Sequence, residues 1–188
     1  MIKIGITGSL ASGKTTASQI LSHNRGPLFS ADKVVKKLYK DKNFKKLLSK
    51  KFNIKNNNRI KKNLKKIILS NKKNIKKLEK IIHPKVRIYM EKFTKKNKNK
   101  KFLFYEIPLL IESKLMKYFN FIIFIKATRS LRLKRFKLKG GDKNFFNLLD
   151  MKQLNDNKKI KFSDHVVVNE KNFKILKKNL SGIINKYE

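Results

Sequence analysis

Short, almost continuous apolar runs alternate along the chain with longer stretches in which apolar residues recur every three or four positions. Runs of the first kind are typical of strands that are buried on both faces of a parallel sheet. They predict five strands, which lie within residues 28–31 and over residues 2–7, 101–107, 119–125 and 165–168.

Stretches of the second kind predict amphipathic helices between these strands. The longest covers residues 32–98, and its apolar positions form two faces with lysines opposite: Ile60, Leu64, Ile67 and Ile68, then Ile75, Leu78, Ile81 and Ile82. Further helices are expected over residues 15–22, 128–138, 145–155 and 173–184. The asparagine run at residues 56–58 predicts a loop inside the long helical stretch.

Two local signals predict helix starts inside this long stretch. Asp32 follows the second strand and has the side chain of an N-cap residue. Pro84 suits the first position of a helix, so the pair His83-Pro84 is expected to separate two helices.

Strands that alternate with helices predict an α/β fold, a doubly wound sheet of five parallel strands. We expect one domain over residues 1–188, with its core in residues 1–31, 100–127 and 160–188. The helical stretch at about 32–99 is expected to be a substrate-binding subdomain, and the segment at about 128–145 a lid.

Length and composition agree with a single domain. The chain has 188 residues, 40% of them hydrophobic, which is enough for a substantial core. It has no cysteine, so disulfides and thiolate metal sites are excluded. The predicted N-terminal strand leaves no room for a signal peptide, and no apolar run approaches the ~20 residues of a membrane span. We therefore expect a soluble, cytoplasmic protein without a membrane partner.

The formal net charge of +38 has two interpretations. It fits a polyanionic partner such as nucleic acid, or a general enrichment of lysine at exposed positions. Lysine is spread over nearly every segment, and arginine, which reads bases better, is scarce by comparison. The distribution favours the second interpretation, with nonspecific binding to nucleic acid at low salt.

One motif points to a ligand. Residues 8–15 read G-S-L-A-S-G-K-T, a G-x-x-x-x-G-K-T phosphate loop between a predicted strand and a predicted helix. Such loops turn backbone N–H groups and a helix N-terminus toward phosphates. We expect Lys14 to reach the β- and γ-phosphates of ATP and Thr15 to ligate Mg²⁺. The residues expected to bind the nucleotide are Gly8, Ala11, Ser12, Gly13, Lys14, Thr15 and Thr16.

Two carboxylates follow predicted strands, at the edge of the sheet where ligands collect. Asp32 is either a plain helix cap or a general base that orients an acceptor hydroxyl. Glu106 is expected to hold Mg²⁺ through water and to face the substrate. Glu112, a few residues later, is expected only to cap or charge the first turn of the next helix.

Arg129, Arg132 and Arg135 are spaced by three, which places them along one side of a helix. They are either a clamp for the transferred phosphate during lid closure or a solvated basic face. His83 has no partners for a Ser/His/Asp triad or a zinc site in the sequence around it, and a structural role is the simpler interpretation.

Together these segments resemble the dephospho-coenzyme A kinase family. The matching segments, in chain order, are Gly8 to Thr15, Ser30-Ala31-Asp32, His83-Pro84 with Arg87, Pro108 to Glu112, Arg132 and Arg135, Gln153, Lys158-Lys159, and Ser163 to Asn169. The family has Asp where Ser30 stands here, and its second Asp matches Asp32. The phosphate loop alone occurs in many kinases, whereas the ordered set is specific.

The resemblance implies a P-loop kinase that transfers phosphate from ATP to the ribose 3′-hydroxyl of dephospho-coenzyme A. It implies Asp32 as the catalytic base, Lys14 and a lid arginine, either Arg132 or Arg135, around the transferred phosphate, and Asn169 near the nucleotide. It also implies that His83 and Arg87 lie near the acceptor, whose pyrophosphate needs cations.

Two other functions are open to the same motifs. One is another small-molecule kinase, such as a nucleoside monophosphate kinase, although Arg59 and Arg87 are the only arginines between Lys33 and Arg129. The other is a nucleic-acid-binding ATPase. We expect ATP and dephospho-coenzyme A as partners, no specific nucleic acid, and a monomer or weak homo-oligomer.

Overall fold

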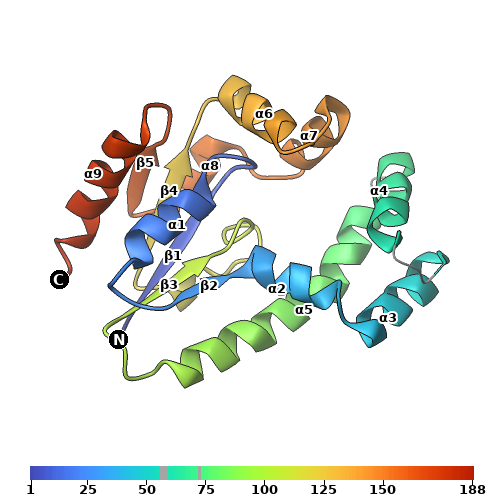
Figure 1. Cartoon of the computed structure of the whole chain (residues 1–188), viewed down its shortest axis with the longest axis horizontal. Helices are drawn as coiled ribbons and strands as arrows, with labels where there is room; N and C mark the ends of the chain where they lie inside the picture. Colours follow the sequence, from blue (N-terminus) through green and yellow to red (C-terminus); the bar gives the residue numbers. More distant parts are fainter. Residues whose placement is uncertain (56–58, 72) are drawn as a thin grey trace. The chain divides into compact units, whose positions relative to one another are not determined.

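Five parallel strands form one sheet in the order β2-β3-β1-β4-β5, which confirms the predicted fold class (Figure 1). The computed structural model describes residues 1–55, 59–71 and 73–188. The strands are β1 (Ile2–Gly8), β2 (Leu28–Ser30), β3 (Phe102–Glu106), β4 (Phe121–Lys126) and β5 (His165–Val168). Because β1 is central, its C-terminal end lies between Glu106 of β3, which is paired with Ile6, and Ile125 of β4, which is paired with Gly8.

Helices connect the strands. They are α1 (Lys14–Ser22), α2 (Ala31–Leu38), α3 (Lys42–Phe52), α4 (Ile60–Ser70), α5 (Lys73–Lys96), a 3₁₀ helix η1 (Met116–Tyr118), α6 (Arg129–Leu138), α7 (Lys143–Asp150), α8 (Asp156–Ile160) and α9 (Phe173–Ile184). The described chain divides into two compact units. The sheet unit contains Met1–Ser30 and Thr94–Glu188, and the helical unit contains Ala31–Phe93.

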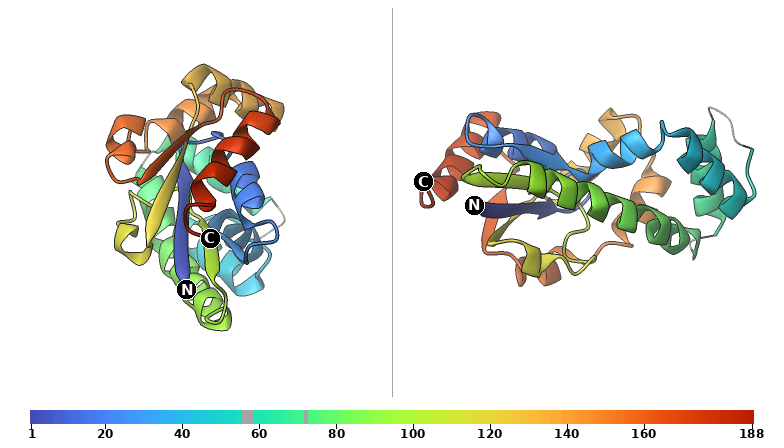
Figure 2. Two further views of the ribbon diagram at one scale, coloured as in Figure 1. Left: turned by 90° about the vertical axis from the view of Figure 1, so that its left-hand side faces the viewer. Right: turned by 90° about the horizontal axis from the view of Figure 1, so that it is seen from below.

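The core of the sheet unit lies between the sheet and two helices, α1 and α9, which pack side by side over one face (Figure 2). Alternate strand residues such as Ile4, Ile6 and Ile123 face them. The helices supply Leu21 and Leu180 and other apolar residues one turn apart. This packing holds α1, and the loop that precedes it, against the end of β1.

The helical unit has its own core. Its buried residues are Leu38, Phe44, Leu48, Phe52, Ile60 and Leu64, with Ile67, Leu78, Ile81 and Ile82 partly buried against them. The three- and four-residue spacing of these positions is the apolar pattern seen in the sequence. Lysines on the opposite faces remain in solvent.

The structure corrects three local predictions. Helix α5 runs without a break through Pro84, so His83-Pro84 does not separate two helices. Helix α2 begins at Ala31, so Asp32 lies within its first turn instead of capping it. The helix predicted over residues 145–155 ends at Asp150, and α8 begins only at Asp156, with Asn155 as its N-cap. The loop predicted at residues 56–58 lies outside the described residues.

None of the helices in the described part of the chain is long and apolar enough to cross a membrane.

Pro84 has no N–H group for the helical bond to the carbonyl of Lys80, and it lies in the interior of α5. We expect Pro84→Ala to supply that donor and to raise the free energy of unfolding by about 1–2 kcal/mol. Thermal denaturation monitored by circular dichroism measures the change, with Lys92→Ala at an exposed position of the same helix as a control. A lower melting temperature for Pro84→Ala would contradict the expectation.

Candidate active site

The turn from β1 into α1 is a curled loop with three residues at positive φ, namely Gly8 (155°), Ala11 (60°) and Gly13 (96°). Two of them have no room for a side chain. A Cβ atom on Gly8 would lie 2.4 Å from the carbonyl oxygen of Ile125, and one on Gly13 would lie 2.1 Å from Nδ2 of Asn169. Close packing against backbone therefore requires glycine at Gly8, whereas at Gly13, where the crowding atom ends a flexible side chain, the positive φ favours glycine.

The carbonyl groups of the loop are bound from outside. The Ser12 carbonyl accepts hydrogen bonds from Asn169 Nδ2 at 2.9 Å and from Arg135 Nη1 at 3.3 Å. The Leu10 carbonyl accepts one from Arg132 Nη1 at 3.2 Å. With these acceptors satisfied, the N–H groups at the start of α1 are left for an anion.

Two side chains of the loop fit a bound phosphate. Lys14 is buried, and its ammonium group donates to the Ser9 carbonyl at 2.9 Å. It can exchange this neutral acceptor for a phosphate oxygen, which forms a stronger, charge-assisted bond. The hydroxyl group of Ser12 is buried and has no hydrogen-bond partner among the described residues. A ligand oxygen would satisfy it.

A hydroxyl and a carboxylate meet beside the loop. Thr15 Oγ1 donates to Glu106 Oε1 at 2.5 Å, and Glu106 is 1% exposed at the end of β3. Hard oxygen donors of this kind suit Mg²⁺, which is usually held by one or two protein oxygens together with phosphate oxygens and water. Across the described residues, no group of three His, Asp or Glu side chains could hold a metal by itself.

The three arginines of α6 occupy different surroundings. Arg132 is buried, and it binds the Ala127 carbonyl, the Leu10 carbonyl and Asp150. Arg135 binds the Ser12 and Asn169 carbonyls. Arg129, whose side chain is 57% exposed, contacts Asp150 and Asn147 at the surface. Arg132 and Arg135 therefore lie against the phosphate loop, whereas Arg129 does not contact it.

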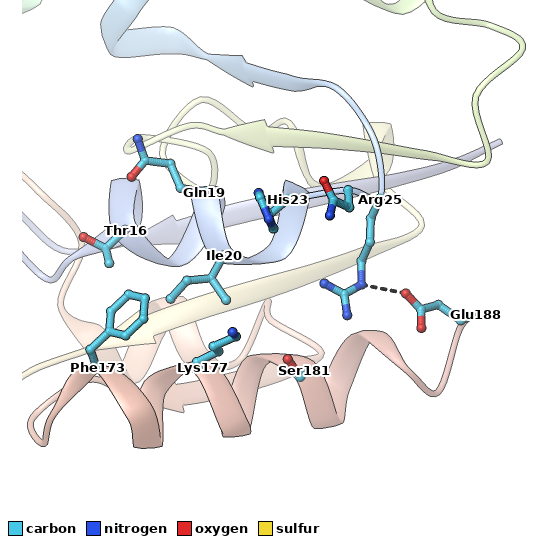
Figure 3. Close-up of a pocket in the computed structure, with 10 residues that line it drawn as sticks. Thr16, Gln19, Ile20, His23, Arg25, Phe173, Lys177, Ser181 and Glu188 are labelled. Carbon is cyan, nitrogen blue, oxygen red and sulfur yellow. Dashed lines mark hydrogen bonds and ion pairs between the residues drawn. The ribbon is translucent and has the colours of Figure 1, made fainter.

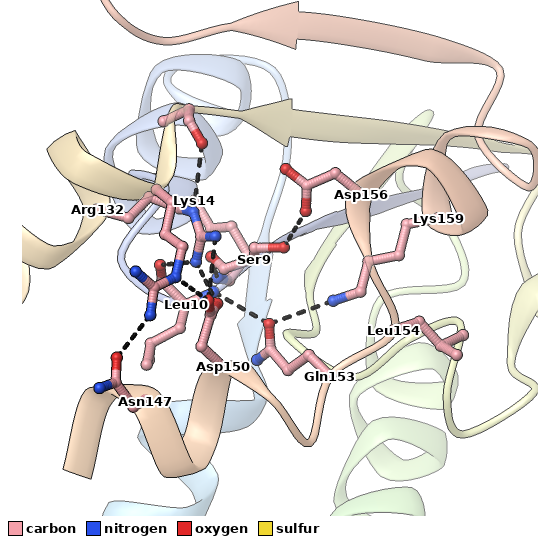
Figure 4. A network of polar contacts seen from close by, with 12 residues as sticks. Ser9, Leu10, Lys14, Arg132, Asn147, Asp150, Gln153, Leu154, Asp156 and Lys159 are labelled. Carbon is pink, nitrogen blue, oxygen red and sulfur yellow. Dashed lines mark hydrogen bonds and ion pairs between the residues drawn. The ribbon is translucent and has the colours of Figure 1, made fainter. Parts of the chain in front are cut away.

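A polar network extends from the loop toward α8 (Figure 4). Gln153 Oε1 accepts from the Leu10 N–H at 3.1 Å and from Lys159 Nζ at 3.3 Å. Lys159, which is 0% exposed, pairs with Glu112 Oε1 at 2.8 Å. Ser9 donates to Asp156 in the same network. Glu112 therefore pairs with Lys159 and accepts from the Leu154 N–H, so the prediction that it caps or charges a helix is wrong.

The resemblance included Gln153 and Lys159 without a role for either, and sequence reasoning did not single out Asp150 or Asp156. One signal was available, because the chain has 12 acidic residues against 50 lysines and arginines. Acids this scarce are informative wherever they occur. Their partners could not be predicted, because each contact joins segments that are far apart in the chain.

The helical unit carries Asp32, His83 and Arg87. Burial lowers the pKa of His83, an effect that Glu79 opposes and Arg87 reinforces. His83 is therefore neutral at neutral pH and is a hydrogen-bonding group instead of a cation. Arg87 is the permanent charge next to it on α5, one turn later.

A separate pocket of about 640 Å³ lies between α1 and α9 in the sheet unit (Figure 3). Thr16, Ile20 and Phe173 line one end of it, and the ion pair of Arg25 with Glu188, at 2.6 Å, lies at the other. Thr16 is exposed and lines this pocket, and its contact with the nucleotide stays a prediction.

Comparison with known proteins identifies relatives of the whole chain. A family model described as dephospho-CoA kinase matches residues 2–174. A dephospho-CoA kinase of Rickettsia typhi is 34% identical over 195 residues, which cover 100% of this chain and 98% of the relative. One of Fusobacterium nucleatum is 32% identical and covers 94% of each chain.

A solved structure agrees with these sequence matches. The dephospho-CoA kinase of Campylobacter jejuni superposes with a TM-score of 0.66 and 27% sequence identity, over 98% of this chain and 96% of that one.

Arg132 holds three separate segments together, so its loss should affect stability. We expect Arg132→Met to lower the free energy of unfolding by about 2–3 kcal/mol. Of the ion pairs of Asp150 among the described residues, it leaves this mostly buried carboxylate only the surface contact to Arg129. Arg129→Met, an exposed control, should cost less than about 1 kcal/mol. Urea denaturation of both variants measures the difference. Equal losses would show that Arg132 has no special structural role.

Proposed function

Because this chain belongs to the dephospho-coenzyme A kinase family, we propose that its phosphate loop and Asp32 together transfer the γ-phosphate of ATP to the ribose 3′-hydroxyl of dephospho-coenzyme A. Members of this family are kinases, that is, phosphotransferases with an alcohol acceptor, and they use ATP. The finer assignments below concern the residues that carry the reaction.

The single observation that carries the proposed binding of ATP is the hydrogen bonding of the phosphate loop. Its outward carbonyl groups already have partners, and the Ser12 hydroxyl inside it has none among the described residues. The loop therefore offers a ligand more hydrogen-bond donors than acceptors, as the binding of a polyphosphate requires. Lys14 adds a positive charge for the β- and γ-phosphates.

Thr15 and Glu106 are our proposed Mg²⁺ residues. The pair is already in contact at 2.5 Å, beside the start of α1. Bound there, the ion would neutralise charge on the β- and γ-phosphate oxygens. Thr15 would offer its hydroxyl oxygen, and Glu106 would orient it or bind a water of the ion.

Asp32 is the proposed base. It comes two residues after Ser30, the end of β2, and Ser30 is paired with Glu106 in the sheet. Ligands of open parallel sheets collect at this edge. A carboxylate in that region can align the acceptor hydroxyl and accept its proton. Ser30 stands where the family has a first Asp, so Asp32 would act without a second carboxylate at that position.

Arg135 is the better of the two candidate phosphate clamps. Arg132 already pairs with a carboxylate, Asp150, at 2.5 Å. In the described part of the chain, Arg135 bonds only carbonyl oxygens, those of Ser12 and Asn169. Its charge is therefore not neutralised by an acid and is available for the transferred phosphate.

For the acceptor, we propose that Arg87 binds the pyrophosphate and that neutral His83 donates or accepts a hydrogen bond next to it. We further propose that the protein works in the cytoplasm on small molecules, as a monomer or weak homo-oligomer. The +38 charge would then reflect exposed lysines and no specific nucleic acid.

An acceptor panel tests the proposed function. We expect ADP release in a coupled assay with dephospho-coenzyme A and MgATP, and a product that is heavier by one phosphate on the 3′-oxygen. Nucleoside monophosphates should give rates at least about 100-fold lower, because the site would lack matching polar contacts for them. ATP hydrolysis stimulated by RNA or DNA, without transfer to dephospho-coenzyme A, would contradict the proposal.

Substitution tests the role of Asp32. We expect Asp32→Asn to lower kcat by about 100-fold or more, since a general base contributes on that scale, while the affinity for ATP stays near that of the wild type. Glu91→Gln removes an exposed carboxylate from α5 of the same unit and should leave kcat unchanged. Near-wild-type turnover by Asp32→Asn would exclude Asp32 as the base.

A further inference from the structure

Ala11 has an unusual backbone conformation for its residue type. Its φ is 60°, in the left-handed region that favours glycine because a Cβ atom crowds the following carbonyl oxygen. Alanine has no polar side chain that could bond locally to stabilise this conformation, as Asn or Asp can. Something outside Ala11 must therefore hold the loop in its curled form.

Contacts from inside and outside the loop hold the backbone around Ala11. Inside the loop, the Ser12 N–H donates to the Ser9 carbonyl at 3.1 Å and closes a four-residue turn with Ala11 as its third residue. On the N-terminal side, the Leu10 N–H donates to Gln153 Oε1 at 3.1 Å, and the Leu10 carbonyl accepts from Arg132. On the C-terminal side, the Ser12 carbonyl accepts from Asn169 and Arg135. Of the outside contacts named here, only the one to Gln153 holds an N–H group of the loop.

The hydrogen-bond donors around the Gln153 amide determine which way it is turned. Its Oε1 atom faces two groups that can only donate, the Leu10 N–H and the ammonium of Lys159 at 3.3 Å. The amide therefore cannot turn its NH₂ group toward them without losing both hydrogen bonds.

Lys159 is in turn fixed by Glu112. The two are 2.8 Å apart, and Lys159 is completely buried. The same Glu112 oxygen accepts from the Leu154 N–H at 3.1 Å, so it also fixes the residue next to Gln153. Glu112 and Lys159 thus hold both the side chain of Gln153 and the turn that carries it between α7 and α8.

We propose that Gln153, oriented by Lys159, is a positioning residue that keeps Ala11 left-handed and so forms the phosphate loop before ATP binds. The inference rests on the proposed function in one respect, that the loop binds ATP. If only a fraction of the molecules have the loop in its binding form, the apparent affinity for ATP is reduced by that fraction. Gln153 should therefore influence the affinity for ATP and leave the acceptor side unaffected.

The first test compares Gln153→Leu with Lys152→Leu, an exposed neighbour. We expect Gln153→Leu to raise the Kd for MgATP by about tenfold, the effect of one lost hydrogen bond that holds a strained conformation. At saturating ATP, kcat and the KM for dephospho-coenzyme A should stay within about twofold, since chemistry is unchanged. Lys152→Leu should change neither constant. An unchanged Kd in Gln153→Leu would overturn the proposal.

The second test separates positioning from ordinary packing. Ala11→Gly removes the cost of the left-handed conformation, so in the Gln153→Leu background it should restore most of the lost ATP affinity. The rescue is measured against the Kd of Ala11→Gly alone, as a double-mutant cycle. A merely structural role of Gln153 would lower the melting temperature without any rescue by Ala11→Gly, and that result would overturn the proposal.

The third test concerns Lys159. Glu112→Gln combined with Lys159→Met removes both charges of the ion pair together, so neither is left alone. We expect it to weaken MgATP binding in the same direction as Gln153→Leu and to be rescued in the same way by Ala11→Gly. Lys158→Met, on the exposed side of α8, is the control and should bind ATP normally.

A measurement without nucleotide keeps this inference separate from the proposed function. Amide hydrogen exchange of the free wild-type protein should show the Leu10 N–H protected, and Gln153→Leu should accelerate its exchange by about tenfold or more. An unprotected Leu10 N–H in the wild type would overturn the positioning role even if no variant folds. Failure of the wild type to bind MgATP, with Leu10 protected, would instead refute the proposed function alone.

Discussion

A phosphate loop can offer its N–H groups to a ligand only if the carbonyl groups of the same turn point elsewhere and find donors there. In this chain Arg132, Arg135 and Asn169 supply those donors, and Lys14 binds the Ser9 carbonyl. These residues come from α6, from the residue after β5 and from α1. The C-terminal half of the sheet unit is therefore arranged around eight residues near the N-terminus.

Electrostatics supports the same arrangement. The chain has 12 acidic residues, and Glu106, Glu112, Asp150 and Asp156 all lie within the loop or its supporting network. Each meets a donor or a cation there. The surrounding excess of lysine stays mostly at the exposed faces of the helices, so the extreme net charge does not disturb the core.

Local sequence signals predicted the elements well, because apolar periodicity and the G-x-x-x-x-G-K-T motif are read within a few residues. They failed at Pro84 and where a longer-range contact decides the outcome. Pro84 stays inside α5, which continues through it. Glu112 was expected at a helix start, yet it binds Lys159, 47 positions later in the chain. Nothing in the sequence around Gln153 indicates that its amide reaches Leu10, 143 residues away.

The central claim is that the loop is formed before the nucleotide arrives, and a crystal structure of the ligand-free protein, paired with one bound to a non-hydrolysable ATP analogue, tests it most directly. We expect Ala11 at positive φ in both, with the Leu10 N–H on Gln153 and the Ser12 carbonyl on Asn169. A ligand-free loop with Ala11 at negative φ and Gln153 detached from Leu10 would contradict the account.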